Sequence, residues 1–430
     1  MLYERWCAVA SRAGAAGALR DLAGGRAWTF AELHAVGERS PEPPGLVVCP
    51  RGNGPEFVLA VLQAWRWRRV VCPLESEQAV PAAIAAMSAT DLAKRLAGVA
   101  HLKLTSATTG APKLIAFAAG QLAADADNVV STMGLRPDWP NVGAISLAHS
   151  YGFSNLVLPL LLHGVPLLLT GSALPEAVRS AGNAASDLTL PGVPALWRAW
   201  HDADAIPPQT RLAISAGAPL PLALEREIFV ARGLKVHNFY GSSECGGIAY
   251  DRTEQPRTAD GCAGSALDNV DLRVGDGGCL EVRGANVARG YWPEPDASLG
   301  NGVFRTADLA AIRDGLVYLR GRAGDLINVA GRKVSPEIIE RVLLEHPAVR
   351  ECVVIGLPAS EHGRGEDIVA VLAAREALAE PALRAFAAAR LPAWQVPRQW
   401  RFVDALPVNA RGKLARAELK QRLAGGPRQP

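Results

Sequence analysis

The sequence predicts an α/β protein with a large N-terminal domain over residues 1–321 and a small α+β domain over residues 322–430. A chain of 430 residues is too long for one hydrophobic core, so we expect more than one domain. Short apolar runs alternate with helical patterns in the first half, which is typical of mixed and parallel sheets covered by helices. After about residue 260, glycines separate shorter runs, which indicates a β subdomain within the large domain.

A strand, helix, strand order recurs three times before the β subdomain. The three sets occupy residues 45–73, 143–170 and 212–240. The second set is expected to begin with a strand over 143–147, and the third to contain a helix over 222–231. Their apolar runs are continuous rather than alternating, as in parallel strands that are buried on both faces. The helix expected over 153–162 contains Pro159, which kinks or ends a helix.

The last part of the chain changes pattern twice. Short strands of the β subdomain are expected over 270–274, 279–282 and 316–319. Beyond Gly321, Ser335 and Pro336 have the positions of an N-cap and a first helical residue. The remaining expected elements are strands over 350–356 and 367–373 and a helix over 381–389. We therefore place a small α+β domain from residue 322 onwards.

Composition excludes several classes of protein. Hydrophobic residues make up 49% of the chain and charged residues 20%, as in ordinary globular proteins. The 45 basic and 42 acidic residues nearly cancel, so we expect no nucleic-acid partner. The most apolar stretch, 156–169, is too short and too interrupted to span a membrane. The first residues do not have the pattern of a signal peptide, so we expect none, and cytoplasm is the expected location.

The seven cysteines give no sign of a metal site or a disulfide framework. They are spread from Cys7 to Cys352, and no CxxC pair occurs. An odd number at irregular spacing predicts free thiols in a reducing compartment, mostly packed in the core.

One segment has the composition of a phosphate-binding loop. Residues 105–113, TSATTGAPK, contain four hydroxyl side chains, a glycine and a lysine. Small hydroxylated residues let backbone N–H groups approach phosphate oxygens, and Lys113 adds a positive charge. The segment lacks the GxxxxGK[ST] pattern of a Walker A loop. From composition alone, a polar surface loop is the alternative.

Six ordered motifs resemble those of the AMP-forming adenylating enzymes. This superfamily includes acyl- and aryl-CoA synthetases, luciferases and peptide-synthetase adenylation domains. The matching segments are 105–113, 215–220, 238–244, 304–309, 321–340 and 406–413. The resemblance extends over roughly residues 100 to 416, with fewer residues before the phosphate loop than relatives carry. The chain therefore resembles a short member with a trimmed N-terminal region.

The resemblance implies a two-step reaction. A carboxylic acid is first joined to the α-phosphate of ATP with release of pyrophosphate, and a thiol then displaces AMP. ATP and Mg²⁺ are implied, with CoA or a phosphopantetheinylated acyl carrier protein as co-substrate. The implied ATP- and AMP-binding residues are Thr105, Ser106, Thr108, Thr109, Gly110, Lys113, Gly217, Ala218, Pro219, Asn238, Tyr240, Gly241, Ser243, Asp308 and Arg322.

Particular roles follow from the same resemblance. Lys413 matches the lysine that assists adenylation from the C-terminal domain, and Glu244 matches the Mg²⁺ ligand. Asp308 is implied to accept hydrogen bonds from both ribose hydroxyls. His149 resembles a histidine beside the carboxylate pocket, with a packed core histidine as the alternative. Gly324 occupies the hinge about which the mobile C-terminal domain is expected to rotate.

The sequence does not determine which carboxylic acid is activated or which molecule accepts the acyl group. The expected acid pocket comprises His149, Tyr151, Phe153, Ser154, Val193 and Ala216. No aspartate is placed to hold an α-amine, which favours an aryl or aliphatic acid over an amino acid. Residues 397–430 carry eight basic and two acidic residues, a balance that suits CoA phosphates or an acidic carrier protein. Adenylate transfer to an amine or hydroxyl, or a catalytically silent binding relative, are the alternatives.

Overall fold

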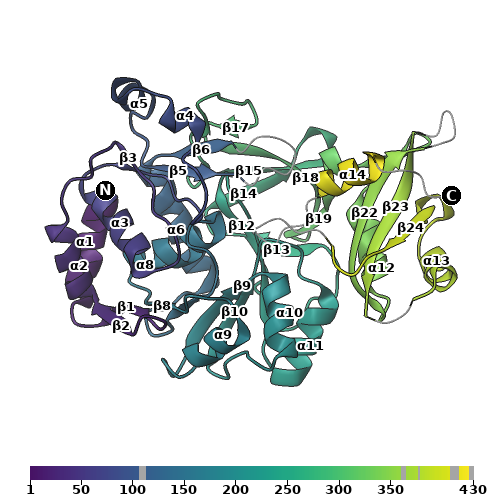
Figure 1. Cartoon of the computed structure of the whole chain (residues 1–430), viewed down its shortest axis with the longest axis horizontal. Coiled ribbons are helices and arrows are strands. Elements are labelled where there is room, and N and C mark those ends of the chain that lie inside the picture. The colour runs from purple at the N-terminus through teal and green to yellow at the C-terminus, as the bar shows by residue number, and fades with distance from the viewer. Residues whose placement is uncertain (106–112, 360–364, 376–377, 407–415, 426–430) are drawn as a thin grey trace.

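The computed structural model describes residues 1–105, 113–359, 365–375, 378–406 and 416–425. It confirms the predicted α/β class, with a large N-terminal assembly of sheets and helices and a small C-terminal α+β unit (Figure 1). The boundary predicted near residue 322 falls at the end of a strand that finishes at Arg322.

The parallel strands predicted within 143–170 and 212–240 and the β subdomain form one continuous sheet. Among the described residues this sheet has 14 strands, and β11 (Val236–Ser242) lies where its parallel part meets its antiparallel part. On the parallel side lie β10 (Thr210–Ser215), β9 (Leu188–Gly192), β7 (Asn141–Gly143), β8 (Leu167–Leu169), β1 (Gly17–Asp21) and, antiparallel at the edge, β2 (Arg26–Thr29). On the other side lie β12 (Gly246–Tyr250), β13 (Cys262–Ala266), β19 (Leu316–Arg322), β18 (Val303–Arg313), β15 (Cys279–Gly284) and β14 (Val270–Val274), while β17 (Leu299–Gly300) pairs with β18.

A second sheet carries the segment that resembles a phosphate loop. Its strand order is β16 (Gly290–Trp292), β6 (Leu114–Phe117), β5 (His101–Leu104), β4 (Val70–Val71) and β3 (Val47–Val48). Strands β5 and β6 are antiparallel and flank residues 105–113. Strand β16 comes from the β subdomain and pairs with β6, so residues near 290 lie beside this loop.

Helices cover both sheets of the large part. Their bounds are α1 (Leu2–Ala13), α2 (Phe30–Arg39), α3 (Pro55–Arg66), α4 (Ala82–Ala85), α5 (Ala89–Arg95), α6 (Ala119–Met133), α7 (Ser150–Gly152), α8 (Leu158–His163), α9 (Pro175–Ala181), α10 (Pro194–Asp202) and α11 (Leu222–Arg232). Helix α2 begins with a capping box, in which Thr29 and Glu32 satisfy each other's backbone N–H groups. The main core joins side chains from distant segments, including Trp6, Phe57 and Phe153.

The helix predicted over 153–162 is present and changes type along its length. Helical backbone continues from Ser150 to His163, with a π-helical turn, η1, over Phe153–Val157 and α8 from Leu158. Pro159 comes directly after the π-helical turn, in which the Leu158 N–H donates to the Phe153 carbonyl. Proline lacks an N–H donor, and the change of helix type beside it lets the helix continue.

The C-terminal unit has its own apolar core, from Ile327 to Trp400. Its elements are β20 (Ile327–Val329), β21 (Arg332–Val334), α12 (Pro336–Leu344), β22 (Val349–Pro358), β23 (Glu366–Ala374), α13 (Glu380–Ala388), β24 (Gln399–Phe402) and α14 (Arg416–Gly425). Helix α12 begins as predicted, with Ser335 as the N-cap residue and Pro336 in the first turn. The Ser335 hydroxyl accepts no backbone N–H of this helix and donates instead to the Glu337 carboxylate.

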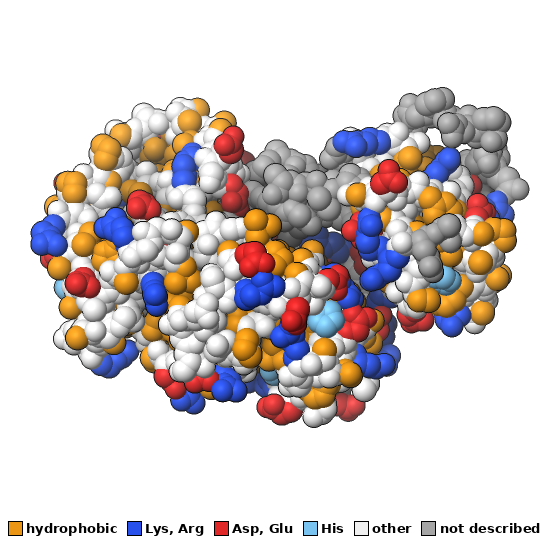
Figure 2. Space-filling view, turned by 60° about the horizontal axis from the view of Figure 1, so that its bottom comes forward, with side chains coloured by type: hydrophobic (Ala, Val, Ile, Leu, Met, Phe, Trp, Pro, Cys, Tyr) orange, Lys and Arg blue, Asp and Glu red, His pale blue; other side chains and the backbone are white. Residues whose placement is uncertain are grey.

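The surface and the thiols fit the composition. Figure 2 shows basic and acidic side chains interspersed over the face in view. In the described ranges, no helix combines the length and the apolar character that crossing a membrane requires. All seven cysteines are free thiols.

Candidate active site

The neck of the predicted phosphate loop is fixed by Thr105 and Lys113. The backbone N–H of Thr105 donates to the Lys113 carbonyl at 2.9 Å, and the Lys113 N–H donates to the Thr105 hydroxyl at 2.9 Å. These bonds extend the β5–β6 ladder to the point where the loop begins. The predicted ligands Ser106, Thr108, Thr109 and Gly110 lie outside the described residues.

A chain of contacts links this neck to Glu244. The Lys113 ammonium lies 4.8 Å from the ring centroid of Tyr291 and 3.3 Å from an Asp296 carboxylate oxygen. The Tyr291 hydroxyl in turn donates to the Glu244 carboxylate at 3.0 Å. Burial, and then the neighbouring Glu244 charge, raise the pKa of Tyr291, so its hydroxyl stays a donor. Three segments that are distant in sequence therefore meet at this point.

Sequence reasoning missed Tyr291 and Asp296. The Gly290–Trp292 run has the pattern of an ordinary short strand, and only the pairing of β16 with β6 brings it to the loop. A signal was available in the aromatic and acidic residues of a glycine- and proline-rich segment, because loop segments often hold binding residues.

Glu244 lies in the tight turn between β11 and β12. Its backbone N–H donates to the Ser242 hydroxyl at 3.2 Å, and its carbonyl accepts from Ala288. Gly241 is required beside the turn, since a Cβ there would lie 2.6 Å from the Gly246 carbonyl oxygen. Ser243, one of the residues implied to bind ATP or AMP, is half-buried in the same turn. The turn thus has a fixed backbone from which the carboxylate projects.

The Glu244 carboxylate fits a magnesium site of one protein ligand. Mg²⁺ commonly takes one or two carboxylates together with substrate phosphates and water. The remaining ligands would come from ATP, because no group of three or more His, Cys, Asp or Glu is placed for a metal in the part of the chain that the structure describes.

Asp308 is held between Tyr240 and Arg322. The Tyr240 hydroxyl donates to Asp308 Oδ2 at 2.5 Å, and Arg322 Nε donates to Asp308 Oδ1 at 2.9 Å. Burial, reinforced by Asp308, raises the pKa of Tyr240 well above its usual value. Asp308 faces Arg322 across the β18–β19 ladder, so the backbone register sets the pair. The predicted ribose-binding carboxylate is thus fixed, and each oxygen keeps a second acceptor position.

The turn at 216–219 lies beside the start of α10. Gly217 has φ of +86°, which only glycine adopts without strain, and a Cβ there would lie 3.4 Å from Val193. The Ala216 N–H donates to the Gly192 carbonyl at 3.1 Å. Ala218 and Pro219 are exposed in the turn. Asn238, at the end of the neighbouring strand pair, is buried and donates to the Cys262 carbonyl at 3.1 Å.

The six predicted acid-pocket residues divide by exposure. Only His149 and Val193 keep intermediate exposure, whereas the other four are buried, namely Tyr151, Phe153, Ser154 and Ala216. His149 caps the short helix α7, and its Nδ1 accepts from the Tyr151 N–H at 3.3 Å. Tyr151 donates its hydroxyl to the Ile214 carbonyl at 3.3 Å. Phe153 packs in the core.

A buried polar cluster lies behind these segments and was not predicted. Asp125 on α6 accepts from the Ser154 hydroxyl at 2.6 Å and from the Gly247 N–H at 3.0 Å. Lys103 on β5 lies 3.3 Å from Ser154 Oγ and 3.9 Å from Asp125. Burial lowers the pKa of Lys103, although the Asp125 charge opposes that shift. The cluster ties the strand before the phosphate loop to the acid-pocket segment and to the strand after Glu244.

Gly324 lies in a 3₁₀ turn, Ala323–Asp325, directly after Arg322. A Cβ at Gly324 would meet nothing within 4 Å, so the position is open. Contacts between the two parts of the chain lie nearby. Gly321 packs against Ser335, and Arg341 forms an ion pair with Asp260 at 3.3 Å.

Lys413 lies outside the described residues, but the helix that follows is anchored. Arg416, the first residue of α14, forms an ion pair with Glu340 at 2.9 Å and donates to the Val354 carbonyl at 3.3 Å. Burial raises the pKa of Glu340 to about 7, against the opposing effects of Arg416 and the Val354 N–H.

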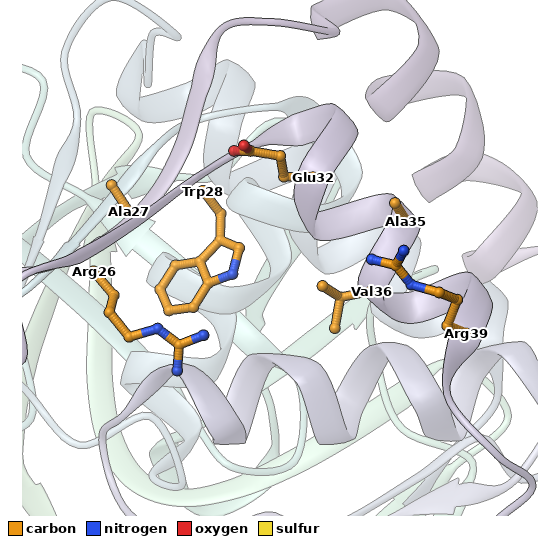
Figure 3. Close-up of a pocket in the computed structure, with 7 residues that line it drawn as sticks. All are labelled: Arg26, Ala27, Trp28, Glu32, Ala35, Val36 and Arg39. Atoms are coloured by element: carbon orange, nitrogen blue, oxygen red, sulfur yellow. The ribbon is translucent and has the colours of Figure 1, made fainter.

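Two surface hollows lie away from the predicted pocket residues. One, of about 460 Å³, is formed by β2 and α2, where Arg26 stacks on Trp28 at 4.6 Å from the ring centroid (Figure 3). The other, of about 290 Å³, lies between β18–β19 and the C-terminal unit, where Leu309, Lys333 and Trp394 contribute to its walls.

Comparisons with known proteins identify the family. Residues 93–292 match the family model described as AMP-binding enzyme, and residues 338–413 match the AMP-binding enzyme C-terminal domain. Together these matches cover more than half of the chain. The chain therefore belongs to the AMP-binding enzymes, the AMP-forming adenylating superfamily.

Individual relatives and structures agree with this assignment. The chain is 31% identical to a feruloyl-CoA synthase from Amycolatopsis sp over 354 residues, covering 77% of this chain and 71% of that protein. It is 32% identical to a probable 2-succinylbenzoate–CoA ligase from Mycobacterium tuberculosis over 350 residues, covering 76% and 85%. Its fold is similar to ATP-bound MatB from Rhodopseudomonas palustris, with a TM-score of 0.85, 24% identity and 99% of each chain covered.

Proposed function

We propose that the protein is an ATP-dependent ligase that activates a carboxylic acid as acyl-AMP and transfers the acyl group to the thiol of CoA. The observation that carries this proposal is the meeting of Lys113, Tyr291 and Glu244 beside the neck of the phosphate loop. A positive charge and a carboxylate at one end of the site would bind the triphosphate and its metal ion, as in-line attack on the α-phosphate requires.

Each fixed group has a place in the first half-reaction. Asp308 would accept the ribose hydroxyls, and Arg322 would lie beside them, since the two side chains are already paired at 2.9 Å. Bound Mg²⁺ would supply charge neutralisation between Glu244 and the phosphates. The predicted role of Lys413 is to bridge the carboxylate and phosphate oxygens, for which a compact charge on a flexible stem is suited.

The second half-reaction would follow rotation of residues 322–430 as a unit about Gly324. The contacts of Gly321 with Ser335 and of Arg341 with Asp260 are among those that such a rotation would have to break. None of these four residues belongs to the apolar core of the C-terminal unit, so their separation would leave that core intact.

The acid that best fits the proposal is an aromatic carboxylic acid without an α-amine. Two relatives more than 30% identical are named for such acids, feruloyl and 2-succinylbenzoate. The residues with remaining exposure near the expected pocket, His149 and Val193, are neutral or weakly basic and offer no anion for an amino group.

An acid panel assayed by ATP–pyrophosphate exchange tests the first half-reaction. We expect exchange with aryl acids, less with fatty acids and none with amino acids. Product analysis with CoA and with a phosphopantetheinylated carrier protein then separates the acceptors. Exchange without any thioester would favour an amine or hydroxyl acceptor, and no exchange with any acid would indicate a silent binding relative.

A further inference from the structure

Cys49 and Cys72 face each other at the carboxyl ends of neighbouring parallel strands. Strands β3 and β4 pair in a constant register that holds on both sides of the two cysteines, at Val48–Val71 and at Arg51–Leu74. The backbone bond from the Cys72 N–H to the Val48 carbonyl, at 2.8 Å, fixes this alignment. Position 49 is therefore the direct partner of position 72.

The placement suits a disulfide. Strands in a sheet lie about 4.8 Å apart, and the Cα atoms of bridged cysteines are about 4.4 to 6.8 Å apart. Both side chains pack against the same apolar cluster, so they lie on the same face of the sheet. The two thiols lie close enough to affect each other's ionisation, and both are free in this structure.

The two thiols differ in reactivity. Cys49 is partly exposed, whereas Cys72 has no exposed surface. The neighbouring Cys72 thiol, with a smaller contribution from Arg51, lowers the pKa of Cys49. The same interaction, together with burial, raises the pKa of Cys72. An accessible thiol with thiolate character beside a buried one is the arrangement of an attacking and a resolving cysteine.

We propose that Cys49 and Cys72 are a redox site that a low-molecular-weight disulfide oxidises reversibly. The Cys49 thiolate attacks one sulfur of that disulfide and expels its first half as a thiol, leaving a mixed disulfide on Cys49. Cys72 then loses its proton and attacks Cys49 Sγ, which expels the second half as a thiol. Two electrons and two protons pass from the protein dithiol to the small disulfide, and one intramolecular S–S bond forms.

The loops that follow the pair connect it to the acid-binding segment. Arg51 donates to the carbonyls of Glu75 and Ser76 at 3.0 and 3.2 Å. The Glu75 carboxylate accepts from the Ser146 hydroxyl at 3.0 Å, three residues before His149. The strand ends can hold the bridge, but forming an S–S bond of about 2.05 Å draws the two sulfur atoms together from non-bonded contact. The loops that follow the two cysteines adjust to this shift, so oxidation weakens use of the acid. This consequence rests on the proposed function.

Thiol mapping tests the site independently of activity. The whole protein is incubated with oxidised glutathione and analysed by intact mass and peptide mapping. We expect wild type to form the Cys49–Cys72 disulfide without retaining glutathione. Cys72→Ser should trap one glutathione on Cys49, and Cys49→Ser should trap none at Cys72. Cys7→Ser, which changes another partly buried cysteine, should behave as wild type. A stable glutathione adduct on wild-type Cys49, or no reaction at either cysteine, would overturn the proposal.

Kinetics test the coupling. In pyrophosphate exchange, oxidised wild type should show a KM for the acid raised roughly fivefold or more, with the KM for ATP nearly unchanged. A reducing thiol should restore the acid KM, and Cys49→Ser should be insensitive to oxidation. An unchanged acid KM in fully oxidised protein would refute the coupling. Failure of the reduced protein to activate any acid would instead refute the proposed function, and the mapping would still stand.

Discussion

Replacing Asp308 with alanine tests nucleotide recognition where the geometry is best fixed. The carboxylate is 17% exposed, with one oxygen bound by Tyr240 and the other by Arg322. Each oxygen can accept one further hydrogen bond, so two ribose hydroxyls can be held. A hydrogen bond to a charged group contributes about 1.5–3 kcal/mol. Losing two of them, about 3–6 kcal/mol together, should weaken ATP use by roughly a hundredfold to ten-thousandfold.

The variant also frees Tyr240 and Arg322, so the loss in ATP use alone does not isolate the ribose contact. A cycle of two enzymes and two nucleotides does so, because 2′-deoxy-ATP removes one hydroxyl from the substrate. Wild type should prefer ATP over 2′-deoxy-ATP in pyrophosphate exchange, and Asp308→Ala should lose that preference. Tyr240→Phe, which keeps the carboxylate, should retain it. If Asp308→Ala discriminates by the wild-type factor, Asp308 does not bind the ribose.

Three further predictions concern the C-terminal unit. Lys413→Ala should remove most pyrophosphate exchange but leave thioester formation from a presynthesised acyl-adenylate much less affected; equal losses would argue against its role. Gly324→Pro locks the backbone φ at about −65°, so thioester output should fall strongly while pyrophosphate exchange stays near normal. Gly324→Ala is the control, because its Cβ would meet no atom within 4 Å. For Glu340, whose pKa burial raises to about 7, the native state binds a proton more tightly than the unfolded chain. Stability from this carboxyl is therefore present below its unfolded pKa near about 4.5 and lost as pH rises through 7.

Denaturant unfolding measures the Glu340 effect. The unfolding free energy of wild type relative to Glu340→Gln should fall by about 3 kcal/mol between pH 4.5 and 7, since one pKa unit is worth about 1.36 kcal/mol. Parallel curves for the two proteins would show that the buried carboxyl does not titrate in this range. Asp314→Asn on a surface turn is a matched control with no comparable burial.

The fold class could be predicted from the sequence because apolar runs and glycine spacing are local signals. Helix α11, expected over 222–231, is found at Leu222–Arg232. The strand expected over 143–147 instead covers Asn141–Gly143, because the backbone beyond it turns to place Ser146 and Leu147 against the loops after β3 and β4. That displacement depends on contacts distant in sequence, which no local pattern contains.

The residues of the candidate site likewise include some that the sequence could predict and some that it could not. Glu244, Asp308 and Arg322 could be selected because each lies in a motif that resembles the family pattern. Tyr291 could not, since its importance arises from the pairing of β16 with β6 across the fold. The buried pair of Lys103 and Asp125 was likewise hidden, because each residue alone resembles an ordinary charged position within a strand or helix.

The central claim is that the acid is activated as acyl-AMP before the thiol attacks. Isotope transfer from a carboxylate labelled with ¹⁸O tests it most directly. The protein is incubated with ATP, Mg²⁺, CoA and a labelled aryl acid that supports pyrophosphate exchange. Attack of the carboxylate on the α-phosphate places one labelled oxygen in AMP, so we predict labelled AMP in equal amount to the acyl-CoA formed. Label in inorganic phosphate, or acyl-CoA formed with unlabelled AMP, would contradict the account.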